Sequence, residues 1–166
     1  MKITINKKIS FNKDSRPYIV AEISGNHNGS KKLFLKHIRE AHKNGADMIK
    51  IQTYEPDDIT IKNTKLDTKI KKGIWKGKNL WDLYNKAQTP FAWHADAFKL
   101  AKKLKITLFS TPFSIRALKF LKKFNPKIYK ISSFEITDFN LINEIAKTKK
   151  PIIISTGSST FSEIKS

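Results

Sequence analysis

Two lysines in strand-like, otherwise apolar segments are the strongest sign of chemistry in this sequence. Lys50 and Gln52 lie two residues apart, as do Lys130 and Ser132, so each pair points to one side of its strand. Because an unpaired ammonium group is costly to bury, each lysine needs either a structural carboxylate or an anionic ligand. Further hydroxyl groups near the ends of such segments belong to Thr111, Ser133 and Ser155. The pattern favours a phosphate or carboxylate site at the carboxyl ends of parallel strands.

Two carboxylates and a polar loop lie near the same strand ends. Glu22 and Glu135 end the first and fourth strand-like segments, where they can act as acid, base or acceptor for sugar hydroxyls. Pairing with the lysines is the structural alternative, and the sequence leaves both open. In the loop 26–29, His27 can be a ligand, a base or an ordinary polar contact. The spacing of the four histidines predicts no metal site, and no glycine-rich nucleotide loop is present.

The elements that position these residues alternate between strand and helix. Runs rich in isoleucine and valine, or ending in hydroxyl residues, predict strands at 19–24, 48–53, 107–112, 128–133 and 152–156. Helical patterns lie between most of them, and Ser30 can cap the first while Gly45 can end it. Such an alternation predicts parallel βα units.

Two segments depart from this alternation. Residues 1–17 contain alternating isoleucines around Asn6, Lys7 and Lys8 and predict a hairpin. Residues 54–106 form a long insertion after the second strand that contains all three tryptophans. Long connections after barrel strands usually have a functional role, because they lie on the face where sites are built.

We therefore expect an α/β fold that is the N-terminal portion, about five βα units, of a (β/α)8 TIM barrel, preceded by a small β-hairpin. A complete barrel needs roughly 250 residues, and this chain has 166. Thr160 and Glu163 have capping-box spacing, so a helix should begin there, and the chain stops about one turn later. A doubly wound open sheet of five strands is the competing architecture.

The composition restricts the partners. The net charge is +19, yet only three of the 33 basic residues are arginines, and the lysines are spread along the chain. Nucleic-acid readers cluster their basic residues and use arginine, so a basic nucleic-acid-binding module is the weaker alternative, and no nucleic-acid partner is expected. No apolar run approaches the roughly 18 residues of a membrane span, and no secretory signal is visible. With no cysteines, a cytoplasmic protein without a membrane partner is expected.

Five motifs recur together in an order that resembles the N-acetylneuraminate synthase family, whose members condense phosphoenolpyruvate with an amino sugar. The motifs are AEISGNHNGS (21–30), GADMIKIQTY (45–54), FSTPFS (109–114), YKISSFEI (129–136) and PIIISTG (151–157). Residues 73–94 resemble most the subgroup that makes pseudaminic acid from a 6-deoxy-2,4-diacetamido hexose. The N-acetylneuraminate and legionaminate synthases are the alternatives within the family.

The resemblance also implies roles for individual residues. The positions that match phosphoenolpyruvate-binding residues are Lys50, Thr111, Lys130, Ser133 and Ser155. Glu22 matches a residue that holds the sugar, and Glu135 matches the carboxylate near the reacting carbons. Gln52 and Asn26 remain substrate-binding candidates without an assigned role.

The family fold is a (β/α)8 barrel followed by an antifreeze-like domain that reaches the partner's active site in a homodimer. The resemblance implies a divalent metal, Mn or Mg, whose histidine ligands lie on later barrel strands. Those ligands, the C-terminal half of the barrel and the antifreeze-like domain are not in this chain. We therefore expect these 166 residues to be inactive as a fragment.

Overall fold

A computed structural model describes residues 2–62 and 69–165 of the chain. Its main sheet has five parallel strands: β3 (Val20–Glu22), β4 (Met48–Thr53), β5 (Thr107–Pro112), β6 (Tyr129–Ile131) and β7 (Ile152–Ile154). The helices are α1 (Lys31–Lys43), α2 (Leu80–Ala87), α3 (Phe91–Leu104), α4 (Ile115–Lys122), α5 (Phe139–Ala146) and α6 (Phe161–Lys165). Single 3-10 turns, η1 (Pro56–Asp58) and η2 (Ser133–Glu135), follow β4 and β6, and a hairpin of β1 (Ile3–Thr4) and β2 (Ser10–Phe11) precedes the sheet.

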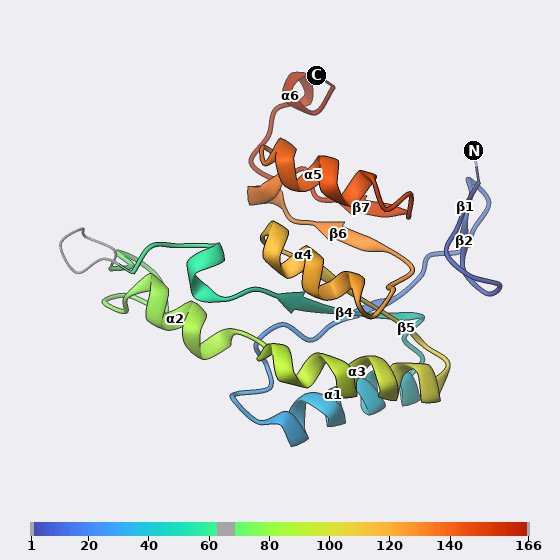
Figure 1. Cartoon of the computed structure of the whole chain (residues 1–166), viewed down its shortest axis with the longest axis horizontal. Coiled ribbons are helices and arrows are strands. Elements are labelled where there is room, and N and C mark those ends of the chain that lie inside the picture. The colour runs from blue at the N-terminus through green and yellow to red at the C-terminus, as the bar shows by residue number, and fades with distance from the viewer. Residues whose placement is uncertain (1, 63–68, 166) are drawn as a thin grey trace.

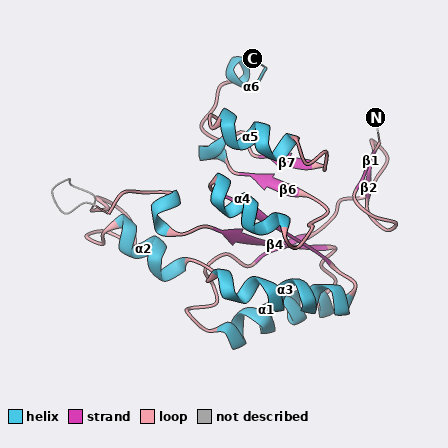
Figure 2. Cartoon of the chain, in the orientation of Figure 1, coloured by secondary structure: helices cyan, strands magenta, loops and turns pink. Residues whose placement is uncertain are grey.

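The strand order decides between the two expected architectures. Along the sheet the strands follow one another as β3-β4-β5-β6-β7, each parallel to its neighbour. A doubly wound sheet requires a point where the strand order reverses, and this sheet has none. Figures 1 and 2 show the βα units stacked one after another. The chain therefore forms a curled half-barrel, as predicted, and the doubly wound alternative is wrong.

Local signals define the helix ends. The Ser30 hydroxyl accepts a hydrogen bond from the Leu33 amide at the start of α1, and Ser114 does the same for Ala117 in α4. Such caps satisfy amide groups that have no partner within the helix. After α1, Gly45 has φ +86°, a left-handed conformation that glycine adopts without strain. The cap at Ser30 and the helix end at Gly45 that the sequence predicted are therefore confirmed.

The two faces of the sheet have different roles. On the outer face, Ile49 and Ile51 of β4 pack with α1 and α3, while Ile131 of β6 packs with α4 and α5. The inner face carries the alternate residues of each strand. Those nearer the amino ends are apolar: Val20, Met48, Phe109, Ile128 and Ile153. Apart from Thr107, which accepts a hydrogen bond from the Asn6 side chain of the hairpin, the polar side chains of the inner face lie in its carboxyl half.

The N-terminal hairpin closes the apolar end of the inner face. Ile5 and Ile9 are buried in the same cluster as Met48 and Phe109. Figure 1 shows the hairpin at the opposite end of β4 from α2. The hairpin predicted within residues 1–17 is thus confirmed, and the structure shows that it covers the amino end of the sheet.

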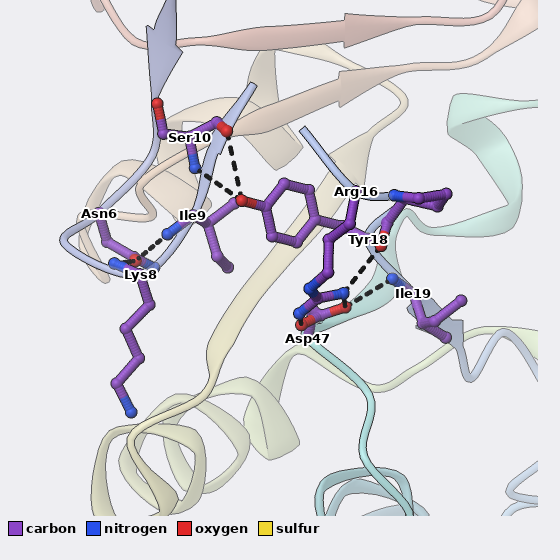
Figure 3. A network of polar contacts seen from close by, with 9 residues as sticks. Asn6, Lys8, Ile9, Ser10, Arg16, Tyr18, Ile19 and Asp47 are labelled. Atoms are coloured by element: carbon purple, nitrogen blue, oxygen red, sulfur yellow. Dashed lines mark hydrogen bonds and ion pairs between the residues drawn. The ribbon is translucent and has the colours of Figure 1, made fainter. Parts of the chain in front are cut away.

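Polar contacts hold the hairpin and the following segment in place. Figure 3 shows Arg16 paired with Asp47, the residue before β4, at 3.0 Å between Nη1 and Oδ2. Asp47 also accepts a hydrogen bond from the Ile19 amide at 2.8 Å. The Tyr18 hydroxyl donates to the Ser10 carbonyl at 3.2 Å. These contacts fix the start of β3 relative to β4.

The insertion lies beyond the carboxyl end of β4 and contains η1 and α2. Arg116 of α4 pairs with Glu55 and with Asp58, the latter at 3.0 Å. The Trp81 indole N–H donates to Asp57 at 2.8 Å. These contacts join η1 to α4 and join α2 to η1, so the described parts of the insertion pack against the half-barrel. Within the predicted range 54–106, α3 is the ordinary helix of the second βα unit.

Candidate functional site

The predicted site residues gather at the carboxyl half of the inner face. Register pairs Glu22 with Lys50 on β3 and β4, and Gln52 with Thr111 on β4 and β5. Lys130 lies two residues after the buried inner-face Ile128, so it also points inward. The two-residue spacing noticed in the sequence therefore places the polar side chains directly above the apolar layer.

The ammonium group of Lys130 is hydrogen-bonded within the protein, and its surroundings disfavour the charged form. Its ammonium group donates to the Ser155 hydroxyl at 2.6 Å and to the Ile131 carbonyl at 2.5 Å. Burial lowers the pKa of Lys130, and repulsion from Lys50 lowers it further. Glu135 and Glu22 act in the opposite direction on the same pKa. Two lysines therefore lie close enough to repel each other, an arrangement that an anion between them would stabilise.

Lys50 forms an ion pair with Glu22. The side chains are partly exposed, at 20% for Lys50 and 34% for Glu22. This is the structural pairing that the sequence left open as the alternative for Glu22. A partly exposed pair of this kind contributes little to stability, so it can rearrange when a ligand with more favourable contacts arrives.

Three buried polar atoms have no hydrogen-bond partner within the described part of the chain. They are Thr111 Oγ1, Ser132 Oγ and Glu135 Oε2. Burial raises the pKa of Glu135, and its own backbone amide and Lys130 oppose that rise. A buried polar group without a partner costs about 1–3 kcal/mol, and such groups are rare away from functional sites. Their gathering beside two lysines is the geometry of a polar ligand site.

Ser133 joins the loops that follow β6 and β7. Its hydroxyl accepts a hydrogen bond from the Gly157 amide at 3.2 Å. A Cβ atom at residue 157 would lie 2.8 Å from Ser133 Oγ, so only glycine allows this approach. Ser133 and Ser155 are therefore brought to the same end of the sheet by neighbouring elements.

A cavity of about 920 Å³ lies beside this cluster, between the β3–α1 loop, the end of β4 and the insertion. Asn26 and Gln52 line it, so the structure brings these two candidates together, at a distinct part of the site from Lys130. Its apolar walls include Tyr54, Trp75 and Tyr84. This volume suits a small-molecule ligand. The sequence pointed to the insertion through its tryptophans, but Tyr54 and Tyr84 were not predicted as lining residues.

The histidines do not form a metal site. His27 and His94 are fully buried and hydrogen-bonded to protein groups, and burial lowers the pKa of both. Over residues 2–62 and 69–165, no group of three or more histidine, aspartate or glutamate side chains is placed to hold a metal ion.

His94 makes the stability of the fold depend on pH. Burial lowers the pKa of His94 from 6.5 to about 4. Between these two values the unfolded chain holds a proton that the folded chain lacks, so the free energy of unfolding falls as the pH decreases. We expect a loss of about 3 kcal/mol from pH 7 to pH 4 from this group. Thermal unfolding midpoints of wild type and His94→Gln across that range measure it, and parallel curves for the two proteins would contradict the assignment.

A parallel βα half-barrel with cationic and hydroxyl side chains at the carboxyl ends of its strands is typical of TIM-barrel enzymes that bind anionic small molecules. Comparison with known proteins shows to which family within this class of enzymes the chain belongs. Residues 37–166 match the NeuB family, so the chain belongs to that family.

Individual relatives agree with this membership. A pseudaminic acid synthase of Campylobacter jejuni strain 81-176 is 48% identical over 155 residues, which cover 93% of this chain and 45% of the relative. An N,N'-diacetyllegionaminic acid synthase of Campylobacter jejuni is 35% identical over 153 residues, covering 89% of this chain and 44% of the relative. The chain thus spans less than half the length of these curated relatives.

A solved structure confirms the fold. The N-acetylneuraminic acid synthetase of Leptospira borgpetersenii, in complex with citrate, superimposes with a TM-score of 0.84 at 27% identity. The match covers 99% of this chain and 53% of that one. Among the described residues, no helix is long and apolar enough to cross a membrane.

Proposed function

We propose that this chain is the N-terminal barrel half of a phosphoenolpyruvate-dependent nonulosonic acid synthase of the pseudaminic acid type. The observation that supports this most is the meeting of Lys50 and Lys130 with the unpartnered atoms of Thr111 and Glu135 at the carboxyl ends of the strands. The higher identity to a pseudaminic acid synthase than to a legionaminic acid synthase supports the subgroup.

In the proposed complex, the ammonium groups of Lys50 and Lys130 bind the phosphate and carboxylate of phosphoenolpyruvate. The Ser155 hydroxyl, which already lies 2.6 Å from Lys130, donates to the same anion, as do those of Thr111 and Ser133. Charge-assisted hydrogen bonds of this kind are short and strong, so they orient the enol carbon C3 toward the sugar.

The reaction forms one carbon–carbon bond. C3 of phosphoenolpyruvate attacks the aldehyde carbon of the open-chain sugar, and the aldehyde oxygen takes up a proton. Water adds at C2 with loss of a proton, and the C2–O bond breaks as inorganic phosphate leaves. The products are a nine-carbon 2-keto acid and phosphate. In this proposal Glu135 orients the water or holds the proton, and its raised pKa suits that exchange.

The cavity beside the lysines receives the sugar in this proposal. Gln52 and Asn26, which line the cavity, offer amide groups for the acetamido substituents. Glu22 accepts a hydrogen bond from Ser24, which lines the same cavity, and can accept from a sugar hydroxyl in the same way. The walls of Tyr54 and Trp75 suit acetamido methyl groups and the C6 methyl of a 6-deoxy hexose.

The divalent metal, Mn or Mg, expected from the family resemblance does not fit the described residues, which offer no ligand group for it. We assign no step of the reaction to it and propose that its ligands lie outside this chain. We also propose a cytoplasmic location for the complete enzyme and, from the resemblance, a homodimer. Sedimentation of the complete protein tests the dimer.

A phosphate-release assay tests the function. The product of the complete reading frame is incubated with phosphoenolpyruvate, a divalent metal and candidate sugars. We expect phosphate release with the 6-deoxy-2,4-diacetamido hexose and a product mass equal to the sum of both substrates and water, less phosphoric acid. Turnover of N-acetylmannosamine but not of the diacetamido sugar would contradict the subgroup. No release of phosphate with any amino sugar would contradict the function.

The 166-residue chain by itself should release no phosphate above background. Its sheet ends at β3 and β7, whose outer edges have no neighbouring strand within the described structure. Large apolar side chains are exposed nearby, including Ile154 at 47% and Phe161 at 71%. Open edges and apolar surface favour association. Size-exclusion chromatography should therefore show oligomers, and a monomeric, active 166-residue protein would overturn this expectation.

A further inference from the structure

The connection between α2 and α3 is held by two buried histidines that the proposed mechanism does not use. His27 comes from the β3–α1 loop, and His94 lies in the first turn of α3. Both side chains have no exposed surface. Each one contacts a group on another element, and both lie within or against residues 89–94.

His27 joins the β3–α1 loop to this connection. The Gly29 amide donates to its Nδ1 at 3.1 Å, so the neutral ring carries its proton on Nε2. Nε2 lies 3.4 Å from the Thr89 hydroxyl, to which it donates. The Trp93 ring packs edge-on against the imidazole, with 5.2 Å between centroids. Burial, and to a lesser extent repulsion from His37, lowers the pKa of His27 and so favours the neutral ring.

His94 joins the same connection to the sheet. The Pro90 carbonyl, which can only accept, lies 3.2 Å from Nδ1, so Nδ1 carries the proton. Nε2 then accepts from the Thr53 hydroxyl at 2.8 Å. Thr53 Oγ1 lies 2.7 Å from Ser110 Oγ of β5. This chain of contacts lies on the outer face, directly behind the inward-pointing Gln52 and Thr111.

The held connection follows directly after α2, and α2 forms part of the cavity wall. Leu83, Tyr84 and Ala87 of α2 line the same cavity as Asn26 and Gln52. The β3–α1 loop and the end of α2 lie close together, because a Cβ atom at Gly25 would lie 2.8 Å from the Ala87 carbonyl oxygen. A small displacement of α2 would therefore change the shape of the cavity while leaving Lys130 and Ser155 in place.

We propose that His27 and His94 are positioning residues that hold α2 against the β3–α1 loop and the end of β4, and thereby determine sugar recognition and not phosphoenolpyruvate binding. The inference rests on the proposed function, since it assumes that the cavity receives the sugar. Neither histidine touches a substrate in this arrangement.

The test removes single hydroxyl groups with little change in volume. Thr89→Val removes the partner of His27, and Thr53→Val removes that of His94; His42→Asn, on the exposed end of α1, is the control. In the product of the complete reading frame we expect each valine variant to raise the sugar KM about tenfold and leave the phosphoenolpyruvate KM unchanged, because small misplacements of a positioning wall have large effects. The control should match wild type.

Amide hydrogen exchange supplies a readout that does not need activity. Exchange of α2 should become faster in both valine variants, while that of β5 stays as in wild type. An unchanged sugar KM, an equal rise in both KM values, or unchanged exchange of α2 would overturn the proposal. If wild type itself releases no phosphate, the proposed function fails, and the exchange data still decide whether the histidines hold α2.

Discussion

Replacing Lys130 by alanine should lower kcat/KM for phosphoenolpyruvate by roughly 10- to 150-fold in the product of the complete reading frame. Charge-assisted contacts to a phosphate or carboxylate are worth about 1.5–3 kcal/mol, and this range gives that factor. The fold should survive, because burial already disfavours the charged form of Lys130 and its contacts are to Ser155 and to the Ile131 carbonyl of its own strand. Lys50→Ala should lower kcat/KM by a factor of the same order. This variant should also lose some stability, because it leaves Glu22 without its ion-pair partner.

Lys103→Ala is the matched control for these variants. Lys103 lies on the exposed side of α3, in a chain whose net charge of +19 could attract any anion. If the lysines act only through this general charge, all three variants should show the same small effect, which salt would reduce. Normal phosphoenolpyruvate kinetics in both Lys50→Ala and Lys130→Ala would show that the anion site is wrongly assigned.

Replacing Glu135 by glutamine should lower kcat by about 100-fold or more, the range for loss of a group that manages a proton or orients water. The KM for phosphoenolpyruvate should change little. Glutamine has nearly the same shape and no charge, and burial raises the pKa of Glu135 because the charged form is disfavoured. The variant should therefore be at least as stable as wild type, which thermal unfolding measures.

The same raised pKa predicts the pH dependence. With the carboxylate as the active form, kcat falls as the pH decreases through the pKa of Glu135, and this acid limb lies above the ordinary value of 4.5. Glu135→Gln should lack the limb. An unchanged pH profile in the variant, or a kcat close to that of wild type, would assign the limb to another group and remove Glu135 from the reaction.

Strand periodicity made much of the site predictable. The segments 48–53 and 107–112 were predicted with the bounds that β4 and β5 have, because each run of largely apolar residues ends at hydroxyl residues or a proline. The two-residue spacing of Lys50 and Gln52 then fixed their common face, since side chains alternate along a strand. The other three strands are shorter than predicted, because polar residues at their ends extend into loops, as Ser133 does in η2.

Contacts between distant segments could not be predicted in the same way. Whether Glu22 pairs with Lys50 depends on the register of β3 and β4, which the sequence does not specify. His27 was left open between a ligand, a base and a polar contact, and the structure buries it against Thr89, 62 residues away. Tyr54 and Tyr84 line the cavity only because of the way in which the insertion folds over the strand ends, and this could not be predicted from the sequence either.

A crystal structure of the product of the complete reading frame with phosphoenolpyruvate tests the central claim most directly. We expect the phosphate or the carboxylate within about 3.2 Å of Lys130 Nζ, with the Ser155 and Thr111 hydroxyls directed to the same anion. The Glu22–Lys50 pair should open or share Lys50 with the ligand. Phosphoenolpyruvate bound away from the inner face, with Lys130 still directed only to Ser155 and the Ile131 carbonyl, would contradict the account.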